Sequence, residues 1–298
     1  MNVKTSQHIA DTLCEKIKQK SCICLGFDPV IEQIPDFLKQ RANIHTILST
    51  FFDLMLEALH DKIAMIKFQS ADFEYFGVEG MKALANCLQK TKDAGILRLL
   101  DVKRGDIGRS SDAYANAYLS PTRQLTNDVQ RNEFEADAIT ISPYLGSDSL
   151  ESFFTAAKTY NKGLFVLLKT SNPGAPLIQD IENTQGSVST QLAKWLHTQC
   201  ETDKGKSGFS RIGVVVGATH SHAADFRKLL PHSFFLMPGL GAQGGSTHTV
   251  KQCMTPQQEG VIAPVSRALL YPETNTSSAK AYQSSIQQAF NSLYKDIL

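Results

Sequence analysis

Long apolar runs, paired cysteines and an excess of one charge are all missing from this sequence. No apolar stretch approaches the roughly 20 residues that a membrane-spanning helix needs, so we expect no membrane association. The six cysteines are dispersed without a CxxC pair, which argues against a zinc ribbon, a thioredoxin-like site or a disulfide framework. Lys and Arg number 30 against 29 Asp and Glu, so no global field recruits nucleic acid. Any anionic ligand must therefore be held by local groups.

Metal-binding and targeting patterns are also missing. The eight histidines show no spacing such as HExxH, so we predict no metal site and assign no histidine a role. The first 20 residues mix charged and apolar positions, which predicts an amphipathic helix and not a secretion signal. Together with the unpaired cysteines, this pattern indicates a protein of the reducing cytoplasm.

The chain is long enough to bury a large core. It has 298 residues, of which 42% are hydrophobic and 20% are charged. No low-complexity tract or linker divides it, and an α/β barrel of this length is still one domain. We therefore predict a single domain over residues 1–298.

Eight short segments rich in apolar and β-branched residues recur along the chain. They are residues 22–27, 63–68, 97–102, 136–142, 163–168, 211–216, 234–237 and 260–265. Most of the segments between them are long enough for a helix, and several have helical periodicity, as in 47–56 and 192–196. Eight strands alternating with helices predict the α/β class and a single (β/α)8 TIM barrel.

Polar residues follow the predicted strands. Active-site residues of such barrels lie at the carboxyl ends of the strands, so these residues are expected to form one composite site. Polar strand ends can also reflect nothing more than the loops that follow, and for Ser142 and Thr219 this alternative is equally good. This alternative explains Asp28 and Lys67 less well. Both follow strongly apolar sequences, where a charged side chain needs a partner.

The segment 101–106 (DVKRGD) places four charges where a predicted buried strand ends. Side chains alternate across a strand, so Asp101 and Lys103 share one face while Val102 points the other way. One carboxylate and one ammonium therefore point into the same volume. A solvated surface salt bridge would give the same pattern, and the segment alone does not decide between the two.

A second pattern indicates an anion site. Residues 238–245 (PGLGAQGG) contain four glycines, which let backbone N–H groups approach a ligand, and Arg267 follows the eighth predicted strand. The loops after strands seven and eight are the usual phosphate-binding pair of a (β/α)8 barrel, and a guanidinium binds phosphate oxygens bidentately. We predict that the substrate is a phosphomonoester.

Seven motifs together resemble the orotidine 5′-phosphate decarboxylase family, particularly its longer bacterial form. They are residues 26–29 (GFDP), 66–69 (IKFQ), 101–108 (DVKRGDIG), 169–174 (KTSNPG), 216–219 (VGAT), 238–245 (PGLGAQGG) and 266–271 (SRALLY). A wider decarboxylase superfamily shares the DxKxxD pattern, whereas seven such motifs in order are highly specific. The polar segment 175–187 does not align with shorter relatives and is either a lid or a plain insertion.

The resemblance implies a homodimeric lyase that removes CO2 from orotidine 5′-phosphate to give uridine 5′-phosphate, the last step of de novo pyrimidine nucleotide synthesis. It implies that no metal or organic cofactor is needed. Lys67, Asp101 and Lys103 of one subunit would form a charged network with the partner's Asp106, and Lys103 would stabilise and protonate the C6 carbanion. The implied substrate-binding residues are Ser171 and Gln243 at the pyrimidine, and Asp28, Lys67, Ser110 and the partner's Asp106 at the ribose. Arg267, with Gly244 of the glycine loop, would be at the phosphate.

Two other functions share parts of this pattern. A metal-dependent sugar-phosphate decarboxylase or aldolase of the same superfamily would share DxKxxD and the phosphate site, but it typically carries an acid where this chain has Lys67. A catalytically silent nucleotide-binding protein would keep the barrel and the phosphate site. The presence of every charged position argues against this second alternative.

Overall fold

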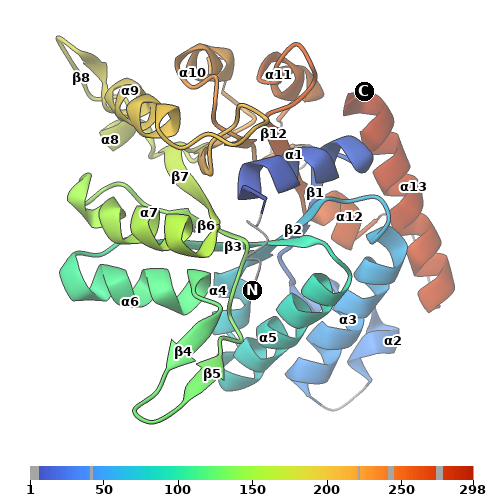
Figure 1. The fold of residues 1–298 in the computed structure, drawn as a ribbon. Helices are drawn as coiled ribbons and strands as arrows, with labels where there is room; N and C mark the ends of the chain where they lie inside the picture. Colours follow the sequence, from blue (N-terminus) through green and yellow to red (C-terminus); the bar gives the residue numbers. More distant parts are fainter. Residues whose placement is uncertain (1–6, 41–42, 221, 241–244, 273–277, 298) are drawn as a thin grey trace.

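Eight parallel strands close into a barrel in this computed structural model, which describes residues 7–40, 43–220, 222–240, 245–272 and 278–297 (Figure 1). The strands are β1 (Ile23–Phe27), β2 (Met65–Gln69), β3 (Leu97–Arg104), β6 (Ala138–Ile141), β7 (Gly163–Lys169), β10 (Ile212–Val216), β11 (Phe235–Leu236) and β12 (Val261–Val265). They neighbour one another in this order, and β12 pairs with β1. The eight predicted strands and the (β/α)8 TIM barrel are confirmed.

Helices surround the barrel. The longer ones are α3 (Ile44–Leu59), α5 (Gly77–Asp93), α6 (Gly108–Leu119), α7 (Asp148–Tyr160), α9 (Val188–Glu201) and α13 (Ala279–Ile297). The shorter ones are α2 (Asp36–Lys39), α4 (Ser70–Glu74), α8 (Pro176–Gln179), α10 (Ala223–Leu229), α11 (Thr247–Gln252), α12 (Arg267–Leu270) and the 3₁₀ turn η1 (Ile31–Gln33). Within the described ranges, no helix is both long and apolar enough to cross a lipid bilayer.

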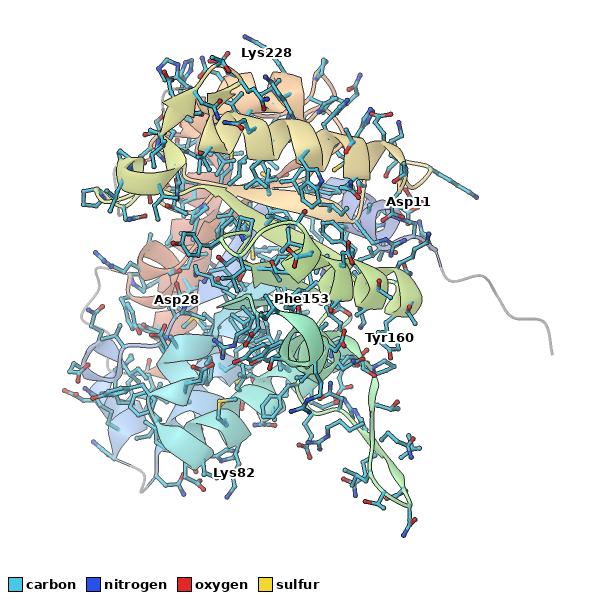
Figure 2. All side chains as sticks on the ribbon, turned by 90° about the vertical axis from the view of Figure 1, so that its left-hand side faces the viewer. Asp11, Asp28, Lys82, Phe153, Tyr160 and Lys228 are labelled. Carbon is cyan, nitrogen blue, oxygen red and sulfur yellow. The ribbon has the colours of Figure 1, made fainter. Side chains whose placement is uncertain are left out.

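The strand side chains alternate between two apolar layers. Leu100 belongs to the large layer between the strands and the helices, while Leu99 belongs to the layer inside the barrel. The predicted amphipathic N-terminal helix is α1 (Ile9–Gln19), whose Leu13 packs against the inner layer. Asp11 of α1 accepts hydrogen bonds from the backbone N–H groups of Lys206 and Ser207. Asp11 thus lies at the end of the barrel where the strands begin, whereas Asp28 follows β1 at the opposite end; both are labelled in Figure 2.

Two hairpins interrupt the barrel pattern, and neither was predicted. The antiparallel pair β4 (Thr122–Gln124) and β5 (Val129–Arg131) lies between α6 and β6 and extends away from the barrel (Figures 1 and 2). The segment 175–187 contains α8 and a second pair, β8 (Glu182–Asn183) and β9 (Gly186–Ser187). The Gln179 side chain bonds both the backbone N–H and the hydroxyl of Thr170. The segment is thus anchored next to the end of β7.

A network of buried ions joins the amino ends of β3, β6 and β7. The Arg98 guanidinium donates to both carboxylate oxygens of Asp137 at 2.9 Å, and Lys162 Nζ lies 2.6 Å from Glu135 Oε1. Burial alone would raise the pKa of Glu135, but the hydrogen bonds from Lys162 and Lys92 outweigh it and hold the pKa below its ordinary value. Burial of Asp137 is likewise outweighed by Arg98, which lowers its pKa. The carboxylates therefore stay ionised inside the protein.

Replacing Glu135 with Gln should destabilise the fold without touching the cavity described below. The substitution leaves the buried Lys162 ammonium without its closest anion, which costs about 3 kcal/mol of unfolding free energy. The measurement is urea denaturation of Glu135→Gln beside Glu133→Gln, an exposed control two residues away.

The pH dependence of that difference has a fixed sign. Because the native pKa of Glu135 is lowered, its contribution is complete above the ordinary carboxyl pKa and is lost as the pH falls through the native value. The difference in unfolding free energy between wild type and Glu135→Gln should therefore become smaller at acid pH. Equal unfolding midpoints of the two substituted proteins at pH 7 would contradict this account.

Candidate active site

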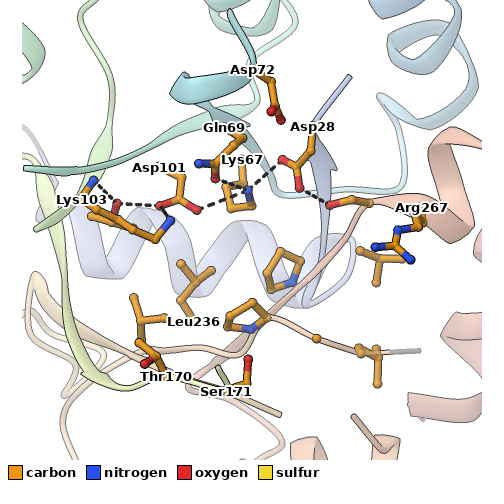
Figure 3. Close-up of a pocket in the computed structure, with 18 of the residues that line it drawn as sticks. Asp28, Lys67, Gln69, Asp72, Asp101, Lys103, Thr170, Ser171, Leu236 and Arg267 are labelled. Atoms are coloured by element: carbon orange, nitrogen blue, oxygen red, sulfur yellow. Dashed lines mark hydrogen bonds and ion pairs between the residues drawn. The ribbon is translucent and has the colours of Figure 1, made fainter. Parts of the chain in front are cut away.

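A cavity of about 430 Å³ opens at the carboxyl ends of the barrel strands (Figure 3). Six residues that the sequence predicted for the site line it: Asp28, Lys67, Asp101, Lys103, Ser171 and Arg267. They are far apart in sequence and meet because parallel strands of a barrel end on the same rim. The prediction that these strand ends face one cavity is confirmed. Ser142 and Thr219, for which a plain loop was an equally good interpretation, do not line it.

The remaining predicted site residues lie elsewhere. Asp106 follows β3, and its carboxylate accepts a hydrogen bond from the backbone N–H of Ile107 at 2.8 Å. Ser110 is exposed in the first turn of α6. Neither residue lines the cavity of its own subunit. Gln243 and Gly244 fall outside the described residues, although Gly239 and Leu240, which begin the same loop, line the cavity.

Four side chains of alternating charge cross one wall of the cavity. Lys67 Nζ lies 2.8 Å from Asp28 Oδ1 and 3.4 Å from Asp101 Oδ2. Lys103 Nζ lies 2.6 Å from the other oxygen of Asp101, and the Ser266 hydroxyl donates to Asp28 Oδ2 at 2.6 Å. Figure 3 shows these contacts as one continuous row. The row fixes both ammonium groups before any ligand binds.

The electrostatics of the row keep its members charged. Burial alone would lower the pKa of Lys67, but the carboxylates of Asp28 and Asp101 outweigh it and raise that pKa above the ordinary lysine value. Burial of Asp101 is outweighed in turn by Lys67 and Lys103, which lower its pKa. The Lys103 side chain is 45% exposed, whereas that of Lys67 is 7% exposed. Lys103 is therefore the cation of the row that a ligand reaches most directly.

The end of β3 is irregular, and this irregularity determines where Lys103 points. Alternation along a regular strand predicted that Asp101 and Lys103 share a face, and both do line the cavity. However, Lys103 has a left-handed backbone with φ of 46°, and the pairing of β3 with β6 shifts its register between Leu100 and Arg104. The predicted direction is confirmed, but a bulge produces it. Val102 belongs to the large apolar layer between the strands and the helices, so it points the other way, as predicted.

Thr140 is a cavity residue that the sequence analysis missed. Its hydroxyl donates to Asp101 Oδ1 at 2.8 Å and accepts the backbone N–H of Lys103 at 2.9 Å. The available signal was a single polar residue inside the apolar sequence of β6, two positions after Ala138, which faces the barrel interior. A prediction from strand ends selects Ser142, which follows the strand, and not Thr140, which lies within it.

Asp72 of α4 is a second residue that was missed. It lines the cavity and has no hydrogen bond or ion pair with any residue in the described part of the chain. Burial and then the nearby Asp28 carboxylate raise its pKa to about 6. No strand-end argument could find it, because it lies one turn into a short helix after β2.

The cavity has chemically distinct sides. Leu167, Val215 and Leu236 give it an apolar wall that suits the face of a planar ring. Figure 3 shows Lys103 and Arg267 on opposite sides of this wall. No residue among the described ones forms an ion pair with the exposed Arg267 guanidinium. The described ranges also contain no cluster of three or more His, Cys, Asp or Glu residues able to hold a metal. The arrangement suits a ligand with an anionic end, a ring and a second anionic group.

Comparisons with known proteins agree on one family. Residues 23–282 match the family model described as Orotidine 5'-phosphate decarboxylase / HUMPS family. An orotidine 5'-phosphate decarboxylase of Caldicellulosiruptor bescii is 36% identical over 90% of this chain and 91% of its own length. That of Clostridium kluyveri is 31% identical over 97% of both. The crystal structure of a putative orotidine 5'-phosphate decarboxylase from Streptomyces avermitilis has 28% identity and a TM-score of 0.81, covering 100% of this chain and 98% of that one.

Replacing Asp72 with Asn should stabilise the protein at high pH. Because the native pKa is raised to about 6, ionising this carboxyl opposes folding above that pH, and the cost disappears at pH values where Asp72 is protonated in both states. After allowance for solvent screening, the ionised carboxyl lowers the free energy of unfolding by about 1 kcal/mol. Removing this cost should raise the melting temperature by roughly 2 °C at pH 8.

The check is the melting temperature of Asp72→Asn and wild type at pH 8 and pH 4. The expected difference is near zero at pH 4. Asp93→Asn, a substitution of an exposed acid on α5, is the matched control. A lower melting temperature for Asp72→Asn at pH 8 would contradict this account of Asp72.

Proposed function

This chain belongs to the orotidine 5′-phosphate decarboxylase family and decarboxylates orotidine 5′-phosphate to uridine 5′-phosphate, and we propose that its row of alternating lysines and aspartates carries out that reaction. The observation that supports this most is Lys103, an accessible ammonium fixed against Asp101 at 2.6 Å on the wall of the cavity. We propose that the reaction needs no metal or organic cofactor.

The chemical difficulty lies at C6 of the pyrimidine. When the bond between C6 and the carboxylate breaks, its electron pair stays in the ring plane, where the π system does not delocalise it, so the barrier is large. In the proposed mechanism, the Lys103 ammonium stabilises the charge that grows at C6 and then transfers one proton to it. Neutral CO2 leaves, and solvent returns a proton to the lysine. Lys103 is thus both electrostatic partner and general acid.

Asp101 and Lys67 hold that ammonium in place. Asp101 accepts a hydrogen bond from Lys103 and forms an ion pair with Lys67, so the position of Lys103 does not depend on solvent reorganising during the reaction. Fixed charges aimed at a developing charge act most strongly in a site from which water is excluded. Asp101 also faces the place proposed for the substrate carboxylate, so the departure of CO2 relieves a repulsion between like charges.

The rest of the cavity fits the rest of the substrate. Arg267 and the glycine loop that includes Gly244 would bind the phosphate, since a guanidinium and backbone N–H groups are suited to its oxygens. Ser171 and Gln243 would contact the pyrimidine, and its ring would lie on the apolar wall. Asp28 with Lys67 would hold the ribose hydroxyls. Binding energy from the phosphate would then help to assemble the site around the ring.

We propose a homodimer in which the partner's Asp106 completes each site. Because Ser110 also does not line the cavity of its own subunit, we propose that it too acts from the partner. In support, both residues lie outside the cavity of their own subunit. Large apolar side chains are also exposed in the segments that follow β2, β3 and β6, at the same end of the barrel as the cavity. They are Tyr75, Val78, Ile107, Tyr144 and Leu145, which are 84%, 72%, 60%, 73% and 48% exposed. An apolar face of this kind is suited to being covered by a second copy of the chain.

We further propose that residues 1–298 act as one catalytic domain in the cytoplasm. All eight barrel strands contribute to a single closed sheet, which supports one domain. The six cysteines are free thiols, and five of them are buried, which supports a reducing compartment.

Replacing Lys103 with Ala should abolish turnover in the presence of a chelator. Loss of both the electrostatic partner and the acid should lower kcat by at least about 10³-fold. The assay follows the absorbance of orotidine 5′-phosphate, with Lys82→Ala on the surface of α5 as the control. Near-normal activity of Lys103→Ala would overturn the proposed role. Turnover of a sugar phosphate only after magnesium is restored would favour the metal-dependent relatives.

Mixing two inactive proteins should restore activity if the sites are shared. Lys103→Ala and Asp106→Ala each lack a required group, but a mixed dimer contains one site with the intact Lys103 of one subunit and the intact Asp106 of the other. Random exchange of subunits should recover about one quarter of the wild-type activity, since half of the dimers are mixed and half of their sites are intact. No recovery despite proven subunit exchange would place Asp106 in its own subunit's site or outside catalysis.

A further inference from the structure

The backbone at Lys103 adopts a conformation that its side chain disfavours. Its φ of 46° lies in the left-handed region, where a non-glycine residue is crowded by its own Cβ. Only Asn161 and Gln258 share a positive φ among the described non-glycine residues. Such conformations persist where surrounding contacts hold them, and they gather at functional sites. The contacts that hold Lys103 are therefore part of how the site works.

A bulge in β3 creates this conformation opposite one residue of β6. Leu100 pairs with Ile139, and Arg104 pairs with Ile141, so β3 advances four residues while β6 advances two. The residue of β6 between these two pairs is Thr140. Bulges redirect side chains next to active sites, and this bulge turns Lys103 into the cavity.

Thr140 closes a ring of hydrogen bonds around the bulge. The Lys103 backbone N–H donates to Thr140 Oγ1 at 2.9 Å, so the hydroxyl proton is free to go elsewhere. It goes to Asp101 Oδ1 at 2.8 Å, because an ionised carboxylate only accepts. The same Asp101 oxygen receives Lys103 Nζ at 2.6 Å. One hydroxyl thus connects the backbone of Lys103 with the carboxylate that holds its ammonium.

Arg104 anchors the chain on the other side of the bulge. Its guanidinium donates to the backbone carbonyl of Val102 at 3.1 Å and to Glu74 Oε1 at 2.6 Å, and it lies 5.6 Å from the ring centre of Tyr114. These contacts face away from the cavity and limit how the chain can relax. The hydroxyl of Thr140 is the contact that fixes Lys103 from the cavity side.

We propose that Thr140 is a positioning residue for the decarboxylation, which fixes the left-handed backbone of Lys103 and orients the Asp101 carboxylate through its hydroxyl. This inference rests on the proposed function of Lys103. Thr140 acts through these two neighbours and transfers no proton to the substrate. Thr140 is buried, with 1% of its surface exposed, and its hydroxyl is hydrogen-bonded to both groups.

Three variants separate the hydroxyl from the packing. Thr140→Val keeps the branched shape and removes both hydrogen bonds, whereas Thr140→Ser keeps the hydroxyl and loses only a methyl group. Thr91→Val is the matched control, because the buried Thr91 hydroxyl donates only to the backbone carbonyl of Cys87, within α5. If Thr140→Val does not fold, Thr140→Ala tests the same loss.

The readouts are kcat, KM and the affinity for uridine 5′-phosphate. A misplaced Lys103 should lower kcat of Thr140→Val on the order of 10²-fold while KM and product affinity change little, since displacements of about 1 Å have such effects on rate. Thr140→Ser should stay close to wild type, and Thr91→Val should lose stability without losing kcat. Unchanged kcat in Thr140→Val, or an equal loss in Thr140→Ser, would overturn the proposal.

A second measurement does not depend on activity. Hydrogen exchange of the Lys103 backbone amide, followed by NMR, should be slow in wild type and Thr140→Ser and faster in Thr140→Val. Equal exchange rates in all three proteins would overturn the positioning role even if the wild type failed to decarboxylate orotidine 5′-phosphate. Active wild type with an unaffected Thr140→Val would overturn this inference alone and leave the proposed function standing.

Discussion

The Asp101 carboxylate is the group on which the geometry of the site depends. It is 9% exposed and has three partners: it accepts hydrogen bonds from Lys103 and the hydroxyl of Thr140, and it forms an ion pair with Lys67. A buried carboxylate is costly unless it is paired with opposite charge and hydrogen-bonded, and this one is both. Lys67 lies on β2, Thr140 lies on β6, and Lys103 lies at the bulge of β3. The Asp101 carboxylate therefore also fixes the relative positions of these three strands. The protein thereby holds these charges in position before substrate arrives.

Both ends of β3 carry buried ions, and the difference between the two ends separates stability from catalysis. At the amino end, Arg98 and Asp137 make a bidentate pair, and their neighbours satisfy the remaining charges. At the carboxyl end, charges are left available: the Lys103 ammonium is partly exposed, and Asp72 has no partner among the residues described. A network in which every charge has a partner stabilises the fold, whereas charges that remain accessible can bind a ligand.

The barrel was predictable from the sequence because its strands are buried on both faces and therefore appear as continuous apolar segments. The six cavity residues were predictable because strand ends converge on one rim. Thr140 was not, since it lies within a strand and not at its end, and Asp72 was not, since its helix begins only after the strand. The left-handed Lys103 was also beyond prediction, because alternation assumes a regular strand. β4 and β5 were not predicted because each has only three residues, too few to show the alternation of apolar and polar residues typical of a strand.

The bulge at Lys103 also determines the course of the chain that follows it. Gly105 passes so close to β6 that a Cβ there would lie 3.0 Å from the backbone oxygen of Ser142, and the chain then exposes Ile107 before α6 begins. Asp106 lies in this same short connection and does not line the cavity of its own subunit. In the proposed dimer, the end of β3 and the connection after it therefore supply Lys103 to their own site and Asp106 to the partner's site. A contact that fixes the backbone of Lys103 then also aims Asp106, so catalytic geometry and subunit assembly depend on the same few peptide units.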